Sequence, residues 1–247
     1  MTRPFAPLCV APDQLEMQLR TEGFALLSGS DLTGWLPASP LELDDLHRAW
    51  DGLPPDAYLR DGGRYRRRRH SCFVVNGEQV HQVPHRAHWQ PLEYNALHGG
   101  MQRWFEPVQP EAVSLPVWSR LLERVGEAAS ALRGAQPWYV EAHVFRIDTT
   151  DGIGRPTPEG AHRDGVDLVA VFMVDRHAIK GGESRVFETD GPRGQRFTLT
   201  EPWSLLLLDD ERVIHETTPI QPQAQDQLGW RDTLVLTYRR GGFQGTE

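Results

Sequence analysis

Two potential metal ligands stand one residue apart in the segment EGAHRDGVDLVAVFMV, residues 159–174. His162 and Asp164 are followed at once by apolar residues, which predicts that they open a β-strand. Alternate side chains of a strand share a face, so His162 and Asp164 point the same way while Arg163 points away. One imidazole and one carboxylate supply two of the three ligands of a facial non-haem Fe(II) site. A solvated histidine and aspartate at a strand start is the alternative.

A second histidine with the required surroundings lies in VIHETTPI, residues 213–220. The alternation of this segment places His215 on one face with Val213 and Thr217. The nearby run Leu205–Leu208 is apolar on both faces, as in the central strand of a sandwich. We therefore expect His215 on an interior wall, where a metal on one ring nitrogen would satisfy it. A core histidine bonded to a carbonyl oxygen is the alternative.

The segment RDTLVLTYRR, residues 231–240, begins with an arginine and a threonine two residues apart. Arg231 begins a predicted strand, and Thr233 lies on the same face. An interior guanidinium binds a carboxylate through two parallel hydrogen bonds, and a neighbouring hydroxyl donates a third. An arginine at a strand end, paired with Asp232 or a rim acid, is the alternative.

The composition limits the classes of partner. The chain has 247 residues, a net charge of −8 and 39% hydrophobic residues. The negative charge argues against general affinity for nucleic acid or anionic membranes. The two cysteines form no disulfide framework, and neither a leader segment nor a long apolar run is evident. We expect a cytoplasmic protein, monomeric or homodimeric, that acts on a small molecule and binds neither nucleic acid nor membrane.

The elements that must position these residues are helices first and strands later. The spacing predicts helices over 12–22, 41–50 and 116–132, and a short strand over 24–27. Strands are expected over 138–147, 166–174, 183–189, 195–200, 203–208, 212–218 and 232–239. The fold class is mainly β with N-terminal helices (α+β), built on a double-stranded β-helix, a cupin-like jelly roll. We expect one domain, 1–247, in which a helix-rich part, 1–135, flanks the jelly-roll strands of 136–240, and 241–247 forms a flexible tail.

Two segments of the N-terminal half hold further residues of interest. The arginine-rich run DGGRYRRRRHSCFVV, residues 61–75, reads as a strand passing from the surface into the core, with one arginine possible as an anion ligand. Residues 81–105 contain His81, His85, His88 and His98. Pro84 interrupts any helical His81–His85 pair, so we favour a packed rim segment over a set of loop ligands.

The ordered set His162-x-Asp164, His215 and Arg231-x-Thr233 resembles the Fe(II)/2-oxoglutarate-dependent dioxygenases. The motifs PTPEGAHRDGVDLV, NALHGGMQRWFEP, KGGES and LDDERVIHETTPI resemble, more narrowly, a bacterial family that hydroxylates free L-amino acids, the isoleucine dioxygenase type. The resemblance spans about 58–238. His70, in place of an aromatic residue, and Glu216, in place of a small one, depart from the family pattern.

The resemblance implies a set of ligands and a reaction. His162, Asp164 and His215 would hold Fe(II), and 2-oxoglutarate would chelate the metal and place its C5 carboxylate on Arg231 and Thr233. Reaction with O₂ would give succinate, CO₂ and a hydroxylated aliphatic C–H bond or an oxidised thioether. Charged residues near the ligands in sequence are tentative contacts for the amino-acid substrate: Arg146, Glu159 and Asp167.

Three alternatives stay open at this point. The same oxygenase chemistry could act on a carrier-tethered amino acid or another small metabolite. A cupin-type metalloenzyme would share the barrel without needing Arg231 and Thr233. A metal-free jelly-roll binding module would leave His162, Asp164 and His215 without a common partner.

Overall fold

The computed structural model describes residues 5–245. Its helical elements, including two 3₁₀ turns, are η1 (Pro12–Gln14), α1 (Leu15–Glu22), α2 (Gly29–Trp35), α3 (Pro40–Asp45), η2 (Leu46–Trp50), α4 (Pro110–Val113) and α5 (Pro116–Arg133). Its strands are β1 (Phe24–Leu27), β2 (Arg66–Asn76), β3 (Gln79–Gln82), β4 (Trp138–Asp148), β5 (Leu168–His177), β6 (Ile179–Gly181), β7 (Ser184–Glu188), β8 (Gly194–Phe197), β9 (Ser204–Asp209), β10 (Val213–Thr217), β11 (Ile220–Pro222) and β12 (Trp230–Arg239). The mainly β expectation is confirmed.

The larger layer is a seven-stranded antiparallel sheet in the order β1-β9-β5-β12-β4-β2-β3. Three of these strands come from the helix-rich N-terminal part. β1 pairs with β9, and β2 pairs with β4 along ten residue pairs, from Arg66 opposite Ile147 to Val75 opposite Trp138. Residues 1–135 therefore extend the sheet as well as flank it, because β1 adds to β9 at one end and β2 and β3 add to β4 at the other.

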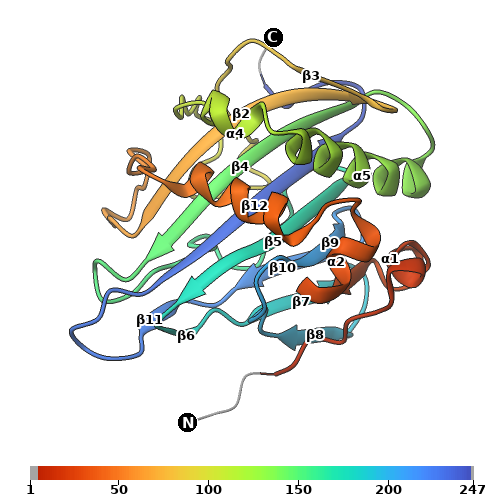
Figure 1. Ribbon diagram of the computed structural model, residues 1–247. Coiled ribbons are helices and arrows are strands. Elements are labelled where there is room, and N and C mark those ends of the chain that lie inside the picture. The colour runs from red at the N-terminus through yellow and green to blue at the C-terminus, as the bar shows by residue number, and fades with distance from the viewer. Residues whose placement is uncertain (1–4, 246–247) are drawn as a thin grey trace.

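The second layer consists of a three-stranded sheet, β10-β7-β8, and the pair β11-β6. The helices pack on one face of the large sheet and the second layer packs on the other (Figure 1). Strand β9 shows both contacts. Leu205 and Leu207 join the core beneath the helices, whereas Leu206 and Leu208 join the core between the sheets. The two-sided burial expected for Leu205–Leu208 is confirmed.

The alternation of β2, β4 and β12 separates an apolar face from a polar one. Val140, Ala142 and Val144 of β4 face the core beneath the helices, as do Leu234 and Leu236 of β12. The intervening residues line a pocket on the other face: Arg66 and Arg68 of β2, Glu141, His143, Phe145 and Ile147 of β4, and Arg231, Thr233, Val235 and Thr237 of β12. Because side chains of a strand alternate between its two faces, every second residue of these three strands contributes to the pocket wall.

The chain after β12 returns to the pocket. Gln244 Nε2 donates to the carbonyl oxygens of Asp164 and Gly165, at 3.0 and 2.7 Å. The ring of Phe243 stacks edge-on against Tyr139 and lines the pocket with Gln244. Residues 243 and 244 thus lie against the pocket, 246–247 lie outside the described residues, and the flexibility expected for the tail 241–247 stays a prediction. No helix within 5–245 is long and apolar enough to cross a membrane.

Candidate metal centre and pocket

His162 and His215 are brought together by their own backbones. The His162 N–H donates to the His215 carbonyl at 3.0 Å, and the His215 N–H donates back to His162 at 2.9 Å. Such a doubly bonded antiparallel pair places its two side chains on the same side. The imidazole centroids lie 4.7 Å apart. A single pairing between the segment before β5 and strand β10 therefore positions both histidines.

Asp164 lies in a turn rather than on the expected strand, because β5 begins only at Leu168. The buried carboxylate of Asp210 holds this turn by accepting from the N–H groups of Asp164, Gly165 and Val166, at 2.9, 2.7 and 3.0 Å. Burial, followed by the Asp164 charge, raises the pKa of Asp210 to about 7, although these three bonds lower it. Gly165 has φ +76°, which lets the chain turn where a side chain would meet the Tyr94 ring.

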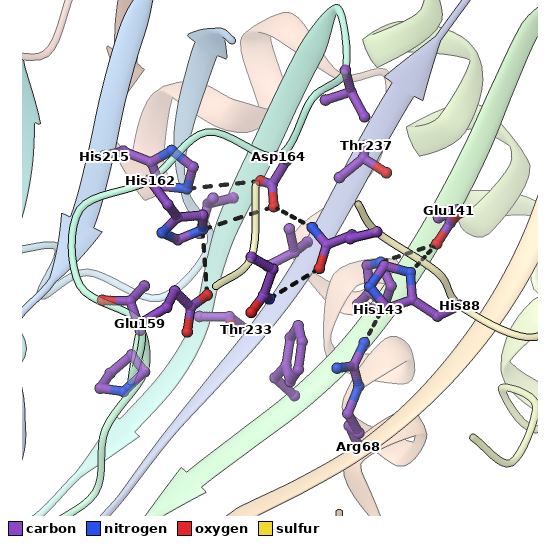
Figure 2. Close-up of a pocket in the computed structure, with 18 of the residues that line it drawn as sticks. Arg68, His88, Glu141, His143, Glu159, His162, Asp164, His215, Thr233 and Thr237 are labelled. Carbon is purple, nitrogen blue, oxygen red and sulfur yellow. Dashed lines mark hydrogen bonds and ion pairs between the residues drawn. The ribbon is translucent and has the colours of Figure 1, made fainter. Parts of the chain in front are cut away.

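The ligand atoms of the three residues face one point. The distances from Asp164 to His162 Nε2 and from Asp164 to His215 Nε2 are both 3.8 Å. They are too long for hydrogen bonds, but ligands held at about 2.0–2.2 Å by one ion lie roughly 3–4 Å apart. The ligand atoms of the three residues all lie within 4.8 Å of one another, close enough to share one ion, and Figure 2 shows the side chains converging.

The hydrogen bond of the His162 ring and the low pKa of His215 suit a metal. The Nδ1 atom of His162 bonds the Gly160 carbonyl at 2.9 Å, which leaves its Nε2 lone pair toward Asp164. Burial alone would lower the pKa of His162, but Asp164 and Glu159 raise it above its ordinary value. Burial, and then His162, holds the pKa of His215 well below the usual range. An Fe(II) ion at this point fits two neutral imidazoles and one carboxylate.

The pocket beside this group contains a cation that lacks a counter-charge. Arg231 is 5% exposed, has no carboxylate within ion-pair distance among residues 5–245, and leaves Nε without a hydrogen-bond partner. Burial, and then Arg176, lowers its pKa to about 9, so it stays charged at neutral pH. Thr233 lines the same wall two residues on, as the alternation predicts. A buried guanidinium and a hydroxyl without an internal partner fit the carboxylate of a dicarboxylic cosubstrate.

A second group of titratable residues lies in the same pocket wall. Glu141 Oε2 is 3.0 Å from His70 Nε2 and 2.5 Å from His88 Nδ1, and lies 3.7 Å from His143 Nε2. Burial would raise the pKa of Glu141, but His88 and His70 hold it well below its ordinary value. Its ionised carboxylate can only accept, so the His70 and His88 nitrogens facing it carry protons.

The protons of this second group oppose a second metal ion. Arg68 donates to His143 Nδ1 at 2.6 Å, so neutral His143 carries its proton on Nε2, the atom that faces Glu141. All three imidazole nitrogens directed at Glu141 are thus donors, and a metal ligand needs a lone pair. The group is a hydrogen-bond network around Glu141, and its members Arg68, His88, Glu141 and His143 are visible at the right of Figure 2. Its residues were not foreseen as a group, although His70 and the arginine-rich run had been singled out in the sequence.

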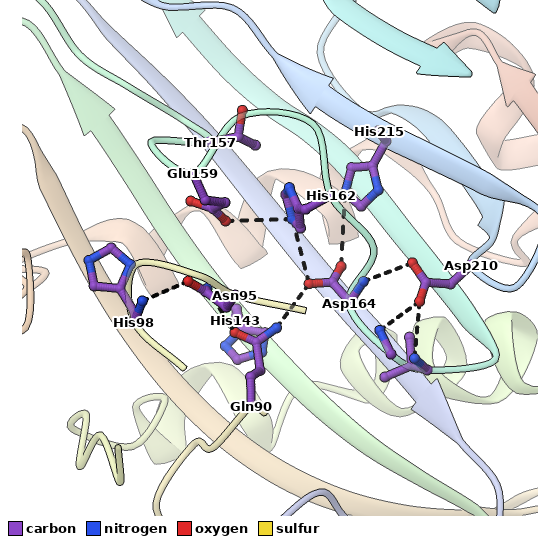
Figure 3. A network of polar contacts seen from close by, with 12 residues as sticks. Gln90, Asn95, His98, His143, Thr157, Glu159, His162, Asp164, Asp210 and His215 are labelled. Carbon is purple, nitrogen blue, oxygen red and sulfur yellow. Dashed lines mark hydrogen bonds and ion pairs between the residues drawn. The ribbon is translucent and has the colours of Figure 1, made fainter. Parts of the chain in front are cut away.

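Gln90 joins this side of the pocket to the metal group (Figure 3). Its Nε2 donates to Asp164 Oδ1 at 3.2 Å, and its Oε1 accepts from Asn95 at 3.1 Å and from Arg103 at 2.9 Å. The segment 81–105 is therefore a packed rim, as favoured from the sequence, with His88 and His98 buried and His81 and His85 exposed. Gln90 and Arg103 were not predicted from the sequence, where their one signal was a place in or near the NALHGGMQRWFEP motif.

The three tentative substrate contacts have different surroundings. Glu159 lines the pocket, with Oε1 3.5 Å from His162 Nε2. Arg146 lies on the opposite face of β4 and donates to both carboxylate oxygens of Asp232, because its neighbours Phe145 and Ile147 take the pocket face. Asp167 accepts from the Arg240 backbone at 2.9 Å and lies outside the pocket lining. Arg146 and Asp167 therefore lie outside the pocket lining, in ion pairs with Asp232 and Arg240 respectively.

Two histidines and one carboxylate on a double-stranded β-helix define a non-haem iron oxygenase site. The model of the 2OG-Fe dioxygenase family matches residues 47–237, so the chain belongs to the 2OG-Fe dioxygenase family. Its cofactors are Fe(II), 2-oxoglutarate and O₂, and His162, Asp164 and His215 are the residues that would hold the metal. Bound Fe(II) and 2-oxoglutarate supply the oxidising chemistry.

Solved structures show the same architecture. A BsmA homologue from Methylobium petroleophilum PM1 is 50% identical, with all of both chains covered and a TM-score of 0.92. A protein called IDO from Bacillus thuringiensis is 15% identical over 95% of this chain and 100% of its own, with a TM-score of 0.75. The Fe(II)/α-ketoglutarate-dependent dioxygenase TqaL is 20% identical over 95% and 90%, with a TM-score of 0.73. The last two likenesses concern the fold. No curated protein matches the sequence.

Proposed function

We propose that this dioxygenase hydroxylates an aliphatic C–H bond, or oxidises a thioether, of a free L-amino acid, with release of succinate and CO₂. In this proposal Arg231 and Thr233 bind the C5 carboxylate of 2-oxoglutarate, which supplies the counter-charge that the buried guanidinium lacks. The motifs around His162 and His215 and the segment NALHGGMQRWFEP support the amino-acid hydroxylase subfamily.

The observation that carries the substrate class is the environment of Glu159. Its Oε2 is buried and has no hydrogen-bond partner among residues 5–245, and its side chain borders the metal group. A buried carboxylate oxygen without a donor is costly. The ammonium group of an amino acid would supply the donor and the opposite charge. Phe145, Val166, Val171 and Val235 line the same pocket and offer an apolar wall for an aliphatic side chain.

The test is a screen for succinate release. The holoenzyme, with Fe(II), 2-oxoglutarate and O₂, is incubated with each free L-amino acid and, separately, with carrier-protein thioesters of the same amino acids. We expect succinate in excess of the uncoupled background with one or a few free aliphatic or thioether amino acids. Coupled turnover of the thioesters alone would replace this proposal with the carrier-tethered reading. No coupled turnover in either set would leave the dioxygenase assignment in place and refute the amino-acid substrate.

A further inference from the structure

The pocket contains a second buried guanidinium without a counter-charge. Arg103 is 2% exposed, lines the pocket, and has no carboxylate within ion-pair distance among the described residues. Its Nη2 donates to Gln90 Oε1 at 2.9 Å, while its buried Nε has no partner in the described chain. A guanidinium has five N–H donors, so most of the hydrogen-bonding capacity of Arg103 is unused.

The two pocket arginines of β2, Arg66 and Arg68, already have partners within the protein. Arg66 donates to Asp56 at 2.7 Å. Arg68 donates to His143, and its guanidinium lies over the rings of Phe105 and Phe145, at 3.8 and 4.3 Å. Burial, and then Arg66, lowers the pKa of Arg103 to about 10, so it remains a cation at neutral pH. Arg239 also lines the pocket, but it is only half-buried and donates to the Gly242 carbonyl at 2.6 Å. Arg103 and Arg231 are therefore the two buried pocket cations of the described chain without a carboxylate partner, and 2-oxoglutarate brings only one carboxylate, to Arg231.

We infer that Arg103 binds the α-carboxylate of the substrate and thereby selects a free amino acid over an amide or a thioester. This inference rests on the proposed function and assigns one residue within it. Glu159 Oε2 and Arg103 Nε lack hydrogen-bond partners within 5–245 and belong to groups of opposite sign in one pocket, which matches the ammonium and carboxylate groups of a zwitterion. Glu159 contributes to the electrostatic environment of Arg103 without pairing with it, and both side chains line the same pocket.

The position of Arg103 also ties this recognition to the metal. Arg103 pairs through its backbone with His88, whose N–H and carbonyl bond it at 2.9 and 3.0 Å, so its strand segment is anchored beside the Glu141 network. Arg103 also donates to Gln90, whose side-chain amide in turn donates to Asp164 Oδ1, so two hydrogen bonds connect Arg103 with this candidate metal ligand. A carboxylate held here fixes the substrate backbone relative to the metal and leaves its side chain to meet the apolar wall.

The experiment is a double-mutant cycle between Arg103 and the substrate carboxylate. Calorimetry under nitrogen, with Fe(II) and saturating 2-oxoglutarate, measures binding of L-isoleucine and of L-isoleucinamide to the wild type and to Arg103→Met. The corresponding pair for leucine or methionine is used if the succinate screen selects that amino acid. We expect the wild type to prefer the acid by roughly 30-fold or more. In Arg103→Met the preference should fall below about 3-fold, because the cycle isolates this one contact from general damage.

Two controls separate this role from a structural one. Arg231→Met should weaken 2-oxoglutarate binding and keep the preference for the acid. Arg60→Met, at an exposed position of the rim, should change neither. Arg103→Lys, which keeps the charge, should recover part of the preference, and it replaces Arg103→Met in the cycle if that variant does not fold.

The outcomes separate the inference from the function on which it rests. A wild type that turns over a free amino acid, with an unchanged acid-to-amide preference in Arg103→Met and Arg103→Lys, overturns the inference and leaves the function standing. A wild type that releases no coupled succinate with any free amino acid refutes the proposed function, and the assignment of Arg103 falls with it.

Discussion

Histidine and carboxylate side chains meet twice in this pocket, and the distances between their atoms distinguish the two groups. The Asp164 carboxylate oxygens lie 3.8 Å from His162 Nε2 and from His215 Nε2, a distance at which the atoms can bind one ion between them. Glu141 Oε2 lies 2.5 Å from His88 Nδ1, which is a hydrogen-bond distance. The same residue types thus form one metal group and one hydrogen-bond network, because the protonation of each ring is set by the partner of its other nitrogen.

The first prediction follows from this difference. The protein should bind one Fe(II) per chain, Asp164→Ala should lose that ion and all coupled succinate release, and Glu141→Gln should keep the ion. Asp164 is the only anionic ligand of the metal group, whereas the histidines around Glu141 offer it N–H groups. Anaerobic equilibrium dialysis with iron analysis measures the stoichiometry. Two ions per wild-type chain, or retention of iron by Asp164→Ala, would contradict it.

Arg231 should affect the cosubstrate and not the metal. Truncating one partner of a buried charge pair costs roughly 2–5 kcal/mol, or about 30-fold to several thousand-fold in affinity. We therefore expect Arg231→Ala to bind Fe(II) normally and to need far more 2-oxoglutarate. The 2-oxoglutarate dependence of succinate release, with the anaerobic visible charge-transfer band of the complex, gives the comparison. An unchanged dependence would remove Arg231 from the cosubstrate site.

At the scale of elements, the metal group depends on how three segments join. The segment before β5 pairs with β10 through His162 and His215, and the β9–β10 turn contributes Asp210, which holds the Asp164 turn. Thr157, in the Gly/Pro-rich loop that rims the pocket, bonds the Thr217 backbone of β10 at 3.0 and 3.1 Å. The candidate metal ligands are therefore positioned by hydrogen bonds to backbone groups, made by the backbone in the His162–His215 pair and by the side chains of Asp210 and Thr157.

Asp210→Ala tests this arrangement. The variant leaves three buried N–H groups of the Asp164 turn without their acceptor, and changes next to a metal ligand typically cost 10–100-fold in metal affinity. We expect a loss of about that size in Fe(II) affinity, measured by anaerobic titration. Asp209→Asn is the matched control, because this equally buried neighbour pairs with Arg133 and makes no contact with the Asp164 turn. Equal losses in the two variants would show that the effect is general destabilisation.

At the scale of the whole molecule, several histidines are buried in the layer between the sheet and the rim. Burial lowers the pKa of His88 to about 4, against the opposing effect of Glu141. Burial likewise lowers the pKa of His70, and burial, followed by Arg68, lowers that of His143. Folding therefore holds these rings neutral at a pH where the unfolded chain would protonate them.

The metal-free protein should therefore lose stability in mild acid. Above pH 6.5, the ordinary histidine pKa, His88 is neutral in both states, and between 6.5 and about 4 only the unfolded chain takes up the proton. The neutral state of His88 therefore contributes about 3 kcal/mol to the free energy of unfolding above pH 6.5, and this contribution is lost as the pH falls from 6.5 to about 4. Urea unfolding from pH 7.5 to 4 measures it. His88→Gln should flatten the dependence, whereas His81→Gln, at an exposed position, should not; equal slopes in all three proteins would refute the assignment.

The oligomeric state remains a prediction. The sequence leads us to expect a monomer or a homodimer, and light scattering of the holoenzyme distinguishes these from larger assemblies.

The sequence by itself determined the features that depend on local alternation. Leu205–Leu208 are buried on both faces, and Thr233 shares the pocket face with Arg231, because a strand repeats every two residues whatever lies beside it. The same rule, counted from Phe145, would have placed Arg146 on the outer face. The sequence also proposed His162, Asp164 and His215 as metal ligands, from their types, their order and the family resemblance, and the structure brings these three residues together.

Only the tertiary structure decided which distant residues meet. Three contacts join segments that are far apart in the chain. His162 pairs with His215, Asp210 accepts from the Asp164 turn, and Gln90 connects Arg103 with Asp164. β2 enters the large sheet from the N-terminal half and turns Arg66 and Arg68 into the pocket. Local spacing encodes which face a side chain takes, but its partner depends on strand register and on closure of the two layers, which the whole chain sets together.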